Sequence, residues 1–111
     1  MSGNSLDRGG ANDDEITYAA LVRALDAGAV ALVDVREQNE WDAGHVEGAT
    51  LNPLSAFDAG KLPRDKPIVL ICRSGNRSMT ALRAARAAGF ADIWHYKGGV
   101  IGWAREGGEL V

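Results

Sequence analysis

Residues 68–79, Ile-Val-Leu-Ile-Cys-Arg-Ser-Gly-Asn-Arg-Ser-Met, join an apolar run to a short polar loop. The continuous apolar run over 68–71 predicts a strand covered on both faces, as in a parallel sheet. From residue 77 the pattern becomes helical, with apolar residues on one face and polar residues on the other. Cys72, the only cysteine of the chain, is therefore predicted at the carboxyl end of a strand, just before a helix. Ligands of open α/β sheets bind at such strand ends.

The remaining sequence alternates between helical and extended patterns. Helices are predicted over 16–28, 37–43 and 77–88, with a helical turn over 54–60 and a last short helix after Gly98-Gly99. Strands are predicted over 30–35, 68–71 and 91–96, while residues 45–52 return the chain toward the core and prolines mark a loop over 63–67. This alternation predicts an α/β fold with a central, mostly parallel sheet flanked by helices on both faces.

Length and charge limit the number of domains and the kinds of partner. With 111 residues the chain fits one domain with a single core. We predict that residues 1–14 form a disordered tail and that residues 15–111 form the domain. The net charge of −3 gives no basic field for nucleic acid, and no apolar run reaches the roughly 20 residues that span a membrane. The first residues lack the apolar centre of a signal peptide, so we expect a cytoplasmic location.

Two roles are open to Cys72. A single cysteine forms no internal disulfide or cysteine-pair metal site, which leaves a buried hydrophobic residue or a reactive thiol. The loop favours the thiol, because backbone N–H groups leading into a helix stabilise an anion and Gly75 permits the tight turn. Arg73 and Arg77 add charge suited to tetrahedral oxyanions, and Ser78 can donate to the sulfur or cap the helix. We therefore expect a lowered pKa and a largely ionised thiol at neutral pH.

Three stretches of the sequence resemble the rhodanese family of sulfurtransferases. The active-site loop of that family follows the pattern Cys-Arg-x-Gly-x-Arg-Ser/Thr, and residues 72–78 match it throughout. The family's two other signatures resemble Leu32-Val33-Asp34-Val35-Arg36-Glu37 with Glu40-Trp41 and Gly44-His45-Val46-Glu47-Gly48-Ala49, and Gly98-Gly99-Val100-Ile101-Gly102-Trp103. Together these stretches extend the resemblance over nearly everything from residue 16 to residue 103.

The resemblance implies a thiosulfate sulfurtransferase that works through a persulfide on Cys72. The thiolate would take the outer sulfur of a donor such as thiosulfate and pass it to cyanide or another thiophile, with no metal or organic cofactor. By the same resemblance, Cys72 is the catalytic nucleophile, and the loop that binds the substrate consists of Arg73, Ser74, Gly75, Asn76, Arg77 and Ser78.

Two other classes of function are weighed against this one. The first is a protein-docking sulfur carrier or regulatory module, in which a protein accepts the sulfur; the intact cysteine loop argues against an inactive binding module but not against a carrier. The second is a phosphatase or arsenate reductase, whose loops resemble Cys-x5-Arg. Here only four residues separate Cys72 from Arg77. A shorter loop suits one sulfur atom better than a phosphoryl group, so sulfur transfer is favoured.

The charged residues that follow the first strand are interpreted as structural. The end of a buried strand needs its polar groups paired, and a network between Asp34 and Arg36 would pair them. Sulfur transfer by a thiolate needs no general acid, which further weakens a catalytic interpretation. The group consists of Asp34, Arg36, Glu37 and Glu40.

The histidines and tryptophans are also given structural roles. His45 is predicted to anchor its loop through hydrogen bonds. His95 has no second histidine or cysteine at metal spacing, which argues against a zinc site. Trp41, Trp94 and Trp103 could lie in the core or at the rim of a pocket, and we favour packing in the core.

Overall fold

The computed structural model describes residues 6–111 and places four parallel strands of this region in one sheet. The strand order is β2-β1-β3-β4, so β3, which ends just before Cys72, lies in the interior of the sheet. The strands are β1 (Ala31–Asp34), β2 (Thr50–Leu51), β3 (Ile68–Ile71) and β4 (Ile93–His95). The helices are α1 (Tyr18–Asp26), α2 (Gln38–Asp42), α3 (Asn76–Ala87) and α4 (Gly99–Arg105).

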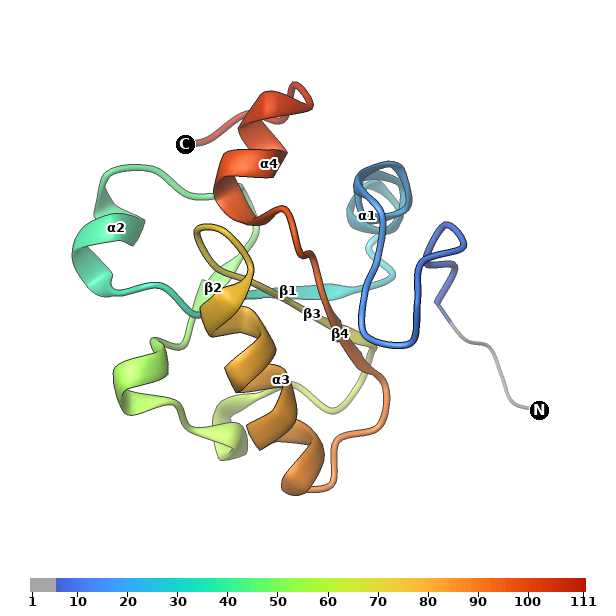
Figure 1. The fold of residues 1–111 in the computed structure, drawn as a ribbon, viewed down its shortest axis with the longest axis vertical. Coiled ribbons are helices and arrows are strands. Elements are labelled where there is room, and N and C mark those ends of the chain that lie inside the picture. The colour runs from blue at the N-terminus through green and yellow to red at the C-terminus, as the bar shows by residue number, and fades with distance from the viewer. Residues whose placement is uncertain (1–5) are drawn as a thin grey trace.

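Helices cover both faces of the sheet, which confirms the predicted fold class. Figure 1 shows α1 and α4 on one side of the strands and α3 on the other. Successive side chains of a strand point to opposite faces. In β3, Val69 and Ile71 therefore pack with α1 and α4, whereas Ile68 and Leu70 pack with α3. Cys72 continues the second series and faces the α3 side of the core.

The predicted helices and strands are present with small shifts at their ends, but one strand was missed. Thr50–Leu51 pairs in parallel with β1, in a stretch expected only to return toward the core. Two residues are too few to produce a recognisable alternation of apolar and polar side chains. The helical turn predicted over 54–60 consists of two short 3-10 helices, Leu54–Ala56 and Ala59–Lys61.

Residues 6–14, the described part of the predicted tail, contact the domain beside β4. The carbonyl of Asp14 accepts a hydrogen bond from the His95 N–H at 2.9 Å, and the N–H of Ile16 donates to the His95 carbonyl at 3.2 Å. Arg86 of α3 pairs with the Asp14 carboxylate at 2.5 Å. Glu15, directly after this segment, forms a single parallel bridge with His95 at the edge of the sheet. Residues 1–5 lie outside the described residues, and their disorder stays a prediction.

The three tryptophans occupy different environments. Trp103 packs in the core beneath α1, and Trp94 is also buried, which confirms the expectation for both. For Trp41 the expectation was wrong. It lies half-buried on α2, a helix without buried residues, and its ring stacks on His45 with 3.7 Å between the ring centroids. A five-residue helix on the surface does not carry its aromatic residue into the core.

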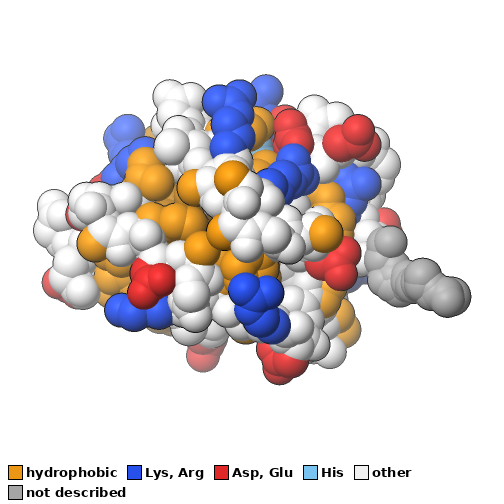
Figure 2. Space-filling model, turned by 90° about the horizontal axis from the view of Figure 1, so that it is seen from below, with side chains coloured by type: hydrophobic (Ala, Val, Ile, Leu, Met, Phe, Trp, Pro, Cys, Tyr) orange, Lys and Arg blue, Asp and Glu red, His pale blue; other side chains and the backbone are white. Residues whose placement is uncertain are grey.

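Charges of both signs are scattered over the underside of the molecule. Figure 2 shows basic and acidic side chains distributed among neutral and hydrophobic ones on this face. Across residues 6–111, every helix is too short or too polar to cross a bilayer.

Candidate active site

Cys72 lies at the base of the loop between β3 and α3. Its side chain is buried, with 1% of the residue exposed. The N–H of Gly75 donates to the Cys72 sulfur at 3.1 Å, and the Ser78 hydroxyl oxygen lies 3.4 Å from the same sulfur. The N-terminal end of α3 begins at Asn76 and adds partial positive charge beside the loop. These donors form a cradle for negative charge on one sulfur atom.

Only glycine suits position 75 of this loop. Gly75 has a φ of 103°, in the left-handed region that residues with a Cβ rarely adopt. A Cβ there would also lie 2.4 Å from the carbonyl oxygen of Lys97. The glycine thus has the conformation expected for the tight turn, and that conformation directs its N–H at the sulfur.

The cradle holds the pKa of the Cys72 thiol below its ordinary value. Burial alone raises this pKa, because a thiolate loses hydration when it leaves water. Hydrogen bonds from the Ser78 hydroxyl and from the N–H groups of Ser78, Gly75 and Ser74 oppose burial and prevail. The direction of the shift agrees with the sequence-based expectation. It makes Cys72 available as a nucleophile at a lower pH than an ordinary cysteine.

The Gly98-Gly99 turn supports the loop through backbone hydrogen bonds. The N–H of Val100 donates to the Cys72 carbonyl at 2.8 Å, and that of Ile101 donates to the Arg73 carbonyl at 3.2 Å. Gly99 packs so closely that a Cβ would lie 2.2 Å from the Arg73 carbonyl oxygen. The start of α4 therefore fixes the backbone of the loop, which gives a physical reason for the glycine at position 99.

Arg77 is engaged in an ion pair that the sequence analysis did not foresee. Its two terminal nitrogens donate to the Glu40 carboxylate oxygens at 2.7 and 2.8 Å. The bidentate bond from Arg77 lowers the pKa of Glu40 to about 2, against the smaller effect of burial. Arg77 thus ties α3 to α2, and its expected role in binding the substrate stays a prediction.

The other predicted binding residues lie on the solvent-exposed side of the loop. Arg73, Ser74 and Asn76 are exposed, and among residues 6–111 no hydrogen bond or ion pair engages the Arg73 guanidinium. A pocket of about 200 Å³ opens beside the loop. Its lining consists of Glu15, Ser74, Gly75, Asn76, Met79, His95 and Lys97.

Ser78 connects the cysteine to His95, a residue whose position near the site was missed. The Ser78 hydroxyl oxygen lies 2.8 Å from His95 Nδ1, and His95 is 1% exposed. From the sequence, only a zinc site was weighed for His95, and it was argued against. A prediction that β4 pairs with β3 would have placed His95 near the site, because His95 lies opposite Leu70 in the sheet. Across residues 6–111, no three metal-binding side chains come together.

Asp34 and His45 have the structural roles that were predicted for them. Both Asp34 carboxylate oxygens accept hydrogen bonds from Arg36, with the shortest at 2.8 Å, and the pair is buried. Arg36 also donates to the Gly44 carbonyl at 2.8 Å. His45 Nδ1 lies 3.1 Å from the Trp41 carbonyl, and the His45 backbone bonds to Val111. These bonds hold the segment between β1 and β2.

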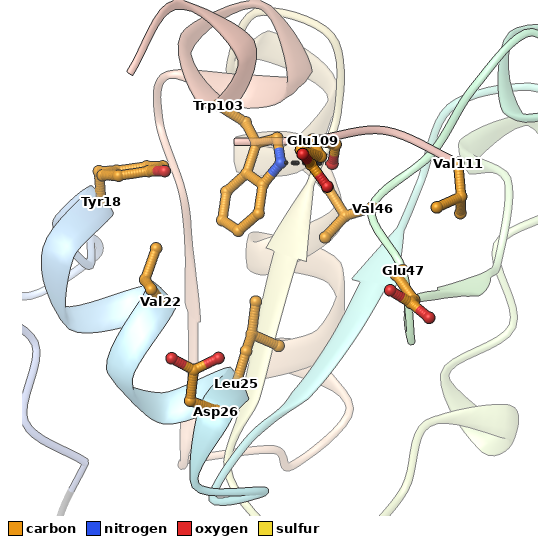
Figure 3. Close-up of a pocket in the computed structure, with 9 residues that line it drawn as sticks. All are labelled: Tyr18, Val22, Leu25, Asp26, Val46, Glu47, Trp103, Glu109 and Val111. Carbon is orange, nitrogen blue, oxygen red and sulfur yellow. Dashed lines mark hydrogen bonds between the residues drawn. The ribbon is translucent and has the colours of Figure 1, made fainter. Parts of the chain in front are cut away.

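A second pocket, of about 310 Å³, lies apart from this loop. Figure 3 shows hydrophobic side chains of α1 and α4 at its centre and three carboxylates around it. Cys72 and its loop are not among the lining residues, so this pocket contributes nothing to the cradle. The residues are Tyr18, Val22, Leu25, Asp26, Val46, Glu47, Trp103, Glu109 and Val111.

Comparisons with known proteins connect this geometry to proteins named for sulfur transfer. The probable adenylyltransferase/sulfurtransferase MoeZ of Mycobacterium tuberculosis is 44% identical over 101 residues. The match covers 86% of this chain but only 26% of MoeZ, so the chain spans about a quarter of that relative. The thiosulfate sulfurtransferase GlpE of Shewanella oneidensis is 33% identical over 85 residues, with 75% of this chain and 84% of GlpE covered.

The fold has a similar counterpart among solved structures. A rhodanese-related protein from Thermoplasma volcanium superposes with a TM-score of 0.80 at 31% identity, covering 88% of this chain and 97% of the other. The family model described as "Rhodanese-like domain" matches residues 17–106, which include every strand and helix described above. The chain belongs to the rhodanese family.

Proposed function

We propose that this protein is a thiosulfate sulfurtransferase in which Cys72 carries the transferred sulfur as a persulfide. The observation that carries the proposal is the cradle around one buried sulfur, with the Gly75 N–H at 3.1 Å and the Ser78 hydroxyl at 3.4 Å. Such donors stabilise a thiolate before the reaction and each time it is released. The relative GlpE, named a thiosulfate sulfurtransferase, supports the choice of donor.

The first half-reaction loads the cysteine. The Cys72 thiolate attacks the outer sulfur of thiosulfate, a sulfur–sulfur bond forms to Cys72, and the sulfur–sulfur bond of thiosulfate breaks. Sulfite leaves with the electron pair of the broken bond. The exposed guanidinium of Arg73 lies at the loop and attracts the dianionic donor.

The second half-reaction discharges the cysteine. Cyanide or another thiophile attacks the outer sulfur of the persulfide, and the Cys72 sulfur leaves as a thiolate. Cyanide becomes thiocyanate, and the electron pair returns to Cys72, where the cradle receives the negative charge. No proton and no external oxidant or reductant enters either half.

The loop length favours sulfur over phosphorus in this cradle. Four residues lie between Cys72 and Arg77, one fewer than in the Cys-x5-Arg pattern of phosphatase loops. In addition, both terminal nitrogens of Arg77 already bind Glu40. A phosphoryl group would need that guanidinium for its oxygens, whereas a single sulfur atom needs only the N–H groups of the loop.

A sulfur carrier with a protein acceptor uses the same residues. The name of the relative MoeZ joins adenylyl transfer to sulfur transfer, and this chain matches only a quarter of that protein. The two roles differ in what discharges the persulfide, a small thiophile or a protein. A free cysteine suits a reducing compartment, so the proposal includes a cytoplasmic location.

Intact mass spectrometry tests the proposal directly. The purified protein should gain the mass of one sulfur atom after exposure to thiosulfate and lose it after addition of cyanide. The matched control is Cys72→Ser, which should gain nothing. Catalytic formation of thiocyanate would support the enzyme, whereas a persulfide that resists cyanide would support the carrier. No gain in mass, or hydrolysis of an aryl phosphate in its place, contradicts persulfide chemistry at Cys72.

A further inference from the structure

A chain of three polar side chains leads from the reactive sulfur into the interior. The Cys72 sulfur lies 3.4 Å from the Ser78 hydroxyl oxygen, which lies 2.8 Å from His95 Nδ1. All three residues are buried, with exposures of 1%, 0% and 1%. The Ser78 oxygen also lies 3.2 Å from the Gly75 carbonyl. The single hydroxyl proton of Ser78 therefore has several acceptors to choose between.

The surroundings of His95 select one arrangement of its protons. Among residues 6–111, His95 Nε2 is the only buried side-chain nitrogen or oxygen without a hydrogen-bond partner. A buried N–H without a partner is rare in folded proteins, because its desolvation is not offset. A neutral ring with its proton on Nδ1 leaves no N–H unpaired, since that proton meets the Ser78 oxygen. The atom without a partner is then the Nε2 lone pair, and unpaired acceptors are less rare in folded proteins than unpaired N–H groups.

This arrangement fixes the direction of the bond to sulfur. If Nδ1–H donates to the Ser78 oxygen, the Ser78 proton cannot turn toward His95. It is left with the Gly75 carbonyl or the Cys72 sulfur. Once the sulfur is ionised, it is the stronger acceptor, because hydrogen bonds to charged atoms are about twice as strong as neutral ones. A hydroxyl that accepts one hydrogen bond also donates a stronger one.

We propose that His95 is a positioning residue, which holds its proton on Nδ1 and thereby directs the Ser78 hydroxyl at the Cys72 thiolate. This inference rests on the proposed function in one respect, that the thiolate is the reacting form. The effect is largest where Cys72 carries full charge, before it attacks the donor and after it leaves the persulfide. Its hydrogen bond is to Ser78, so it acts on the sulfur through that hydroxyl.

The charged groups around His95 allow the neutral ring that this role needs. Burial lowers the pKa of His95, which favours the neutral form at pH 7. Glu15 and Asp14 of the N-terminal segment oppose this shift, while Lys97 after β4 and Arg86 of α3 reinforce it. The net direction is downward, so the ring is expected to stay neutral across the working range of the thiol.

The first test needs no variant. The ¹⁵N chemical shifts of the imidazole ring distinguish Nδ1–H, Nε2–H and doubly protonated histidine in the folded wild-type protein. The expected result at pH 7 is a neutral His95 with its proton on Nδ1. A proton on Nε2, or on both nitrogens, overturns the proposal, because Ser78 is then free to donate to His95 or faces a charged ring.

The second test measures thiol reactivity. The rate of alkylation by iodoacetamide is followed against pH, and its midpoint reports the thiol pKa without any sulfur transfer. His95→Leu should move the midpoint upward and slow alkylation about fivefold at pH values below it, as expected for the loss of about one net hydrogen bond. His95→Asn should stay within about twofold of the wild type, because the amide can donate to Ser78 from near the Nδ1 position.

A double variant separates positioning from general structural support. In a Ser78→Ala background, His95→Leu should produce no further shift of the midpoint, because the residue through which His95 acts is gone. An equal shift in both backgrounds, or equal losses in the Leu and Asn variants, overturns the proposal. If thiosulfate leaves no persulfide on the wild type while the alkylation results hold, the proposed function fails and the assignment of His95 stands.

Discussion

Gly99→Ala is predicted to disable the active-site loop while leaving the fold intact. A Cβ at this position would lie 2.2 Å from the Arg73 carbonyl oxygen and 2.7 Å from the Ser74 nitrogen, both backbone atoms. Because real Cβ contacts stay above 3.0 Å, the Arg73 carbonyl oxygen and the new Cβ must move apart by at least about 0.8 Å. A misplacement of about 1 Å at reacting groups can cost about 100-fold in rate. We therefore expect a loss of about 10- to 100-fold in sulfur transfer.

Gly28→Ala is the matched control for this variant. Gly28 and Gly99 share a φ of 65°, but nothing lies within 4 Å of a Cβ at Gly28. Both variants bear the backbone cost of alanine in the left-handed region, about 1–2 kcal/mol. Only Gly99→Ala should also lose the hydrogen bonds that the start of α4 gives to the loop. Chemical denaturation then measures the shared cost, and the difference between the two variants isolates the clash.

Thiocyanate formation and the alkylation rate of Cys72 together assay the loop. For Gly99→Ala we expect slow transfer and a higher midpoint of the alkylation profile, because the N–H groups move away from the sulfur. Gly28→Ala should match the wild type in both measurements. Wild-type transfer by a folded Gly99→Ala protein would refute the argument that the Gly98-Gly99 turn fixes the cradle.

Three further changes test other contacts of the site. Glu40→Gln should lower the free energy of unfolding by about 1–2 kcal/mol at pH 7, allowing for partial exposure. The pKa of Glu40 is held at about 2, so the ion pair stabilises the fold fully above the ordinary pKa of 4.5 and less as the pH falls toward 2. Chemical denaturation of the wild type and the variant should therefore show a smaller difference in unfolding free energy at pH 3 than at pH 7. Asp34→Asn should cost about 3 kcal/mol in thermal or chemical unfolding, because it leaves the buried Arg36 guanidinium without its counter-charge; a loss under about 1 kcal/mol would contradict that reasoning. Arg73→Ala should raise the KM for thiosulfate about two- to fivefold with kcat little changed, and an unchanged KM at low salt would exclude Arg73 from donor binding.

The loop around Cys72 could be predicted from local sequence, but the residues from other elements that contact it could not. The strand-loop-helix order around Cys72 is local, so the buried apolar run, Gly75 and the helical pattern after it were enough to predict the cradle. The partner of Arg77 was not predictable, because Glu40 lies 37 residues away and meets it only after α2 and α3 dock. A free arginine and an ion-paired arginine have the same sequence pattern.

His95 illustrates the same limit across the sheet. Its sequence neighbours, Trp94 and Tyr96, say only that it belongs to a buried strand. Its contact with Ser78 depends on the pairing of β4 beside β3 and on the side of that strand to which residue 95 points. A shift of one residue in this register would turn His95 to the opposite face, away from the cysteine.

Local sequence was enough to predict the fold class, a candidate nucleophile and the tight turn that follows it, because apolar periodicity, a single cysteine and a glycine at a turn act over neighbouring residues. Packing of the elements set which arginine is ion-paired, placed the Gly98-Gly99 turn against the loop, and brought His95 within hydrogen-bond distance of Ser78. These are contacts between residues far apart in the chain, and their distances are set only when helices pack on the sheet and the strands adopt their register.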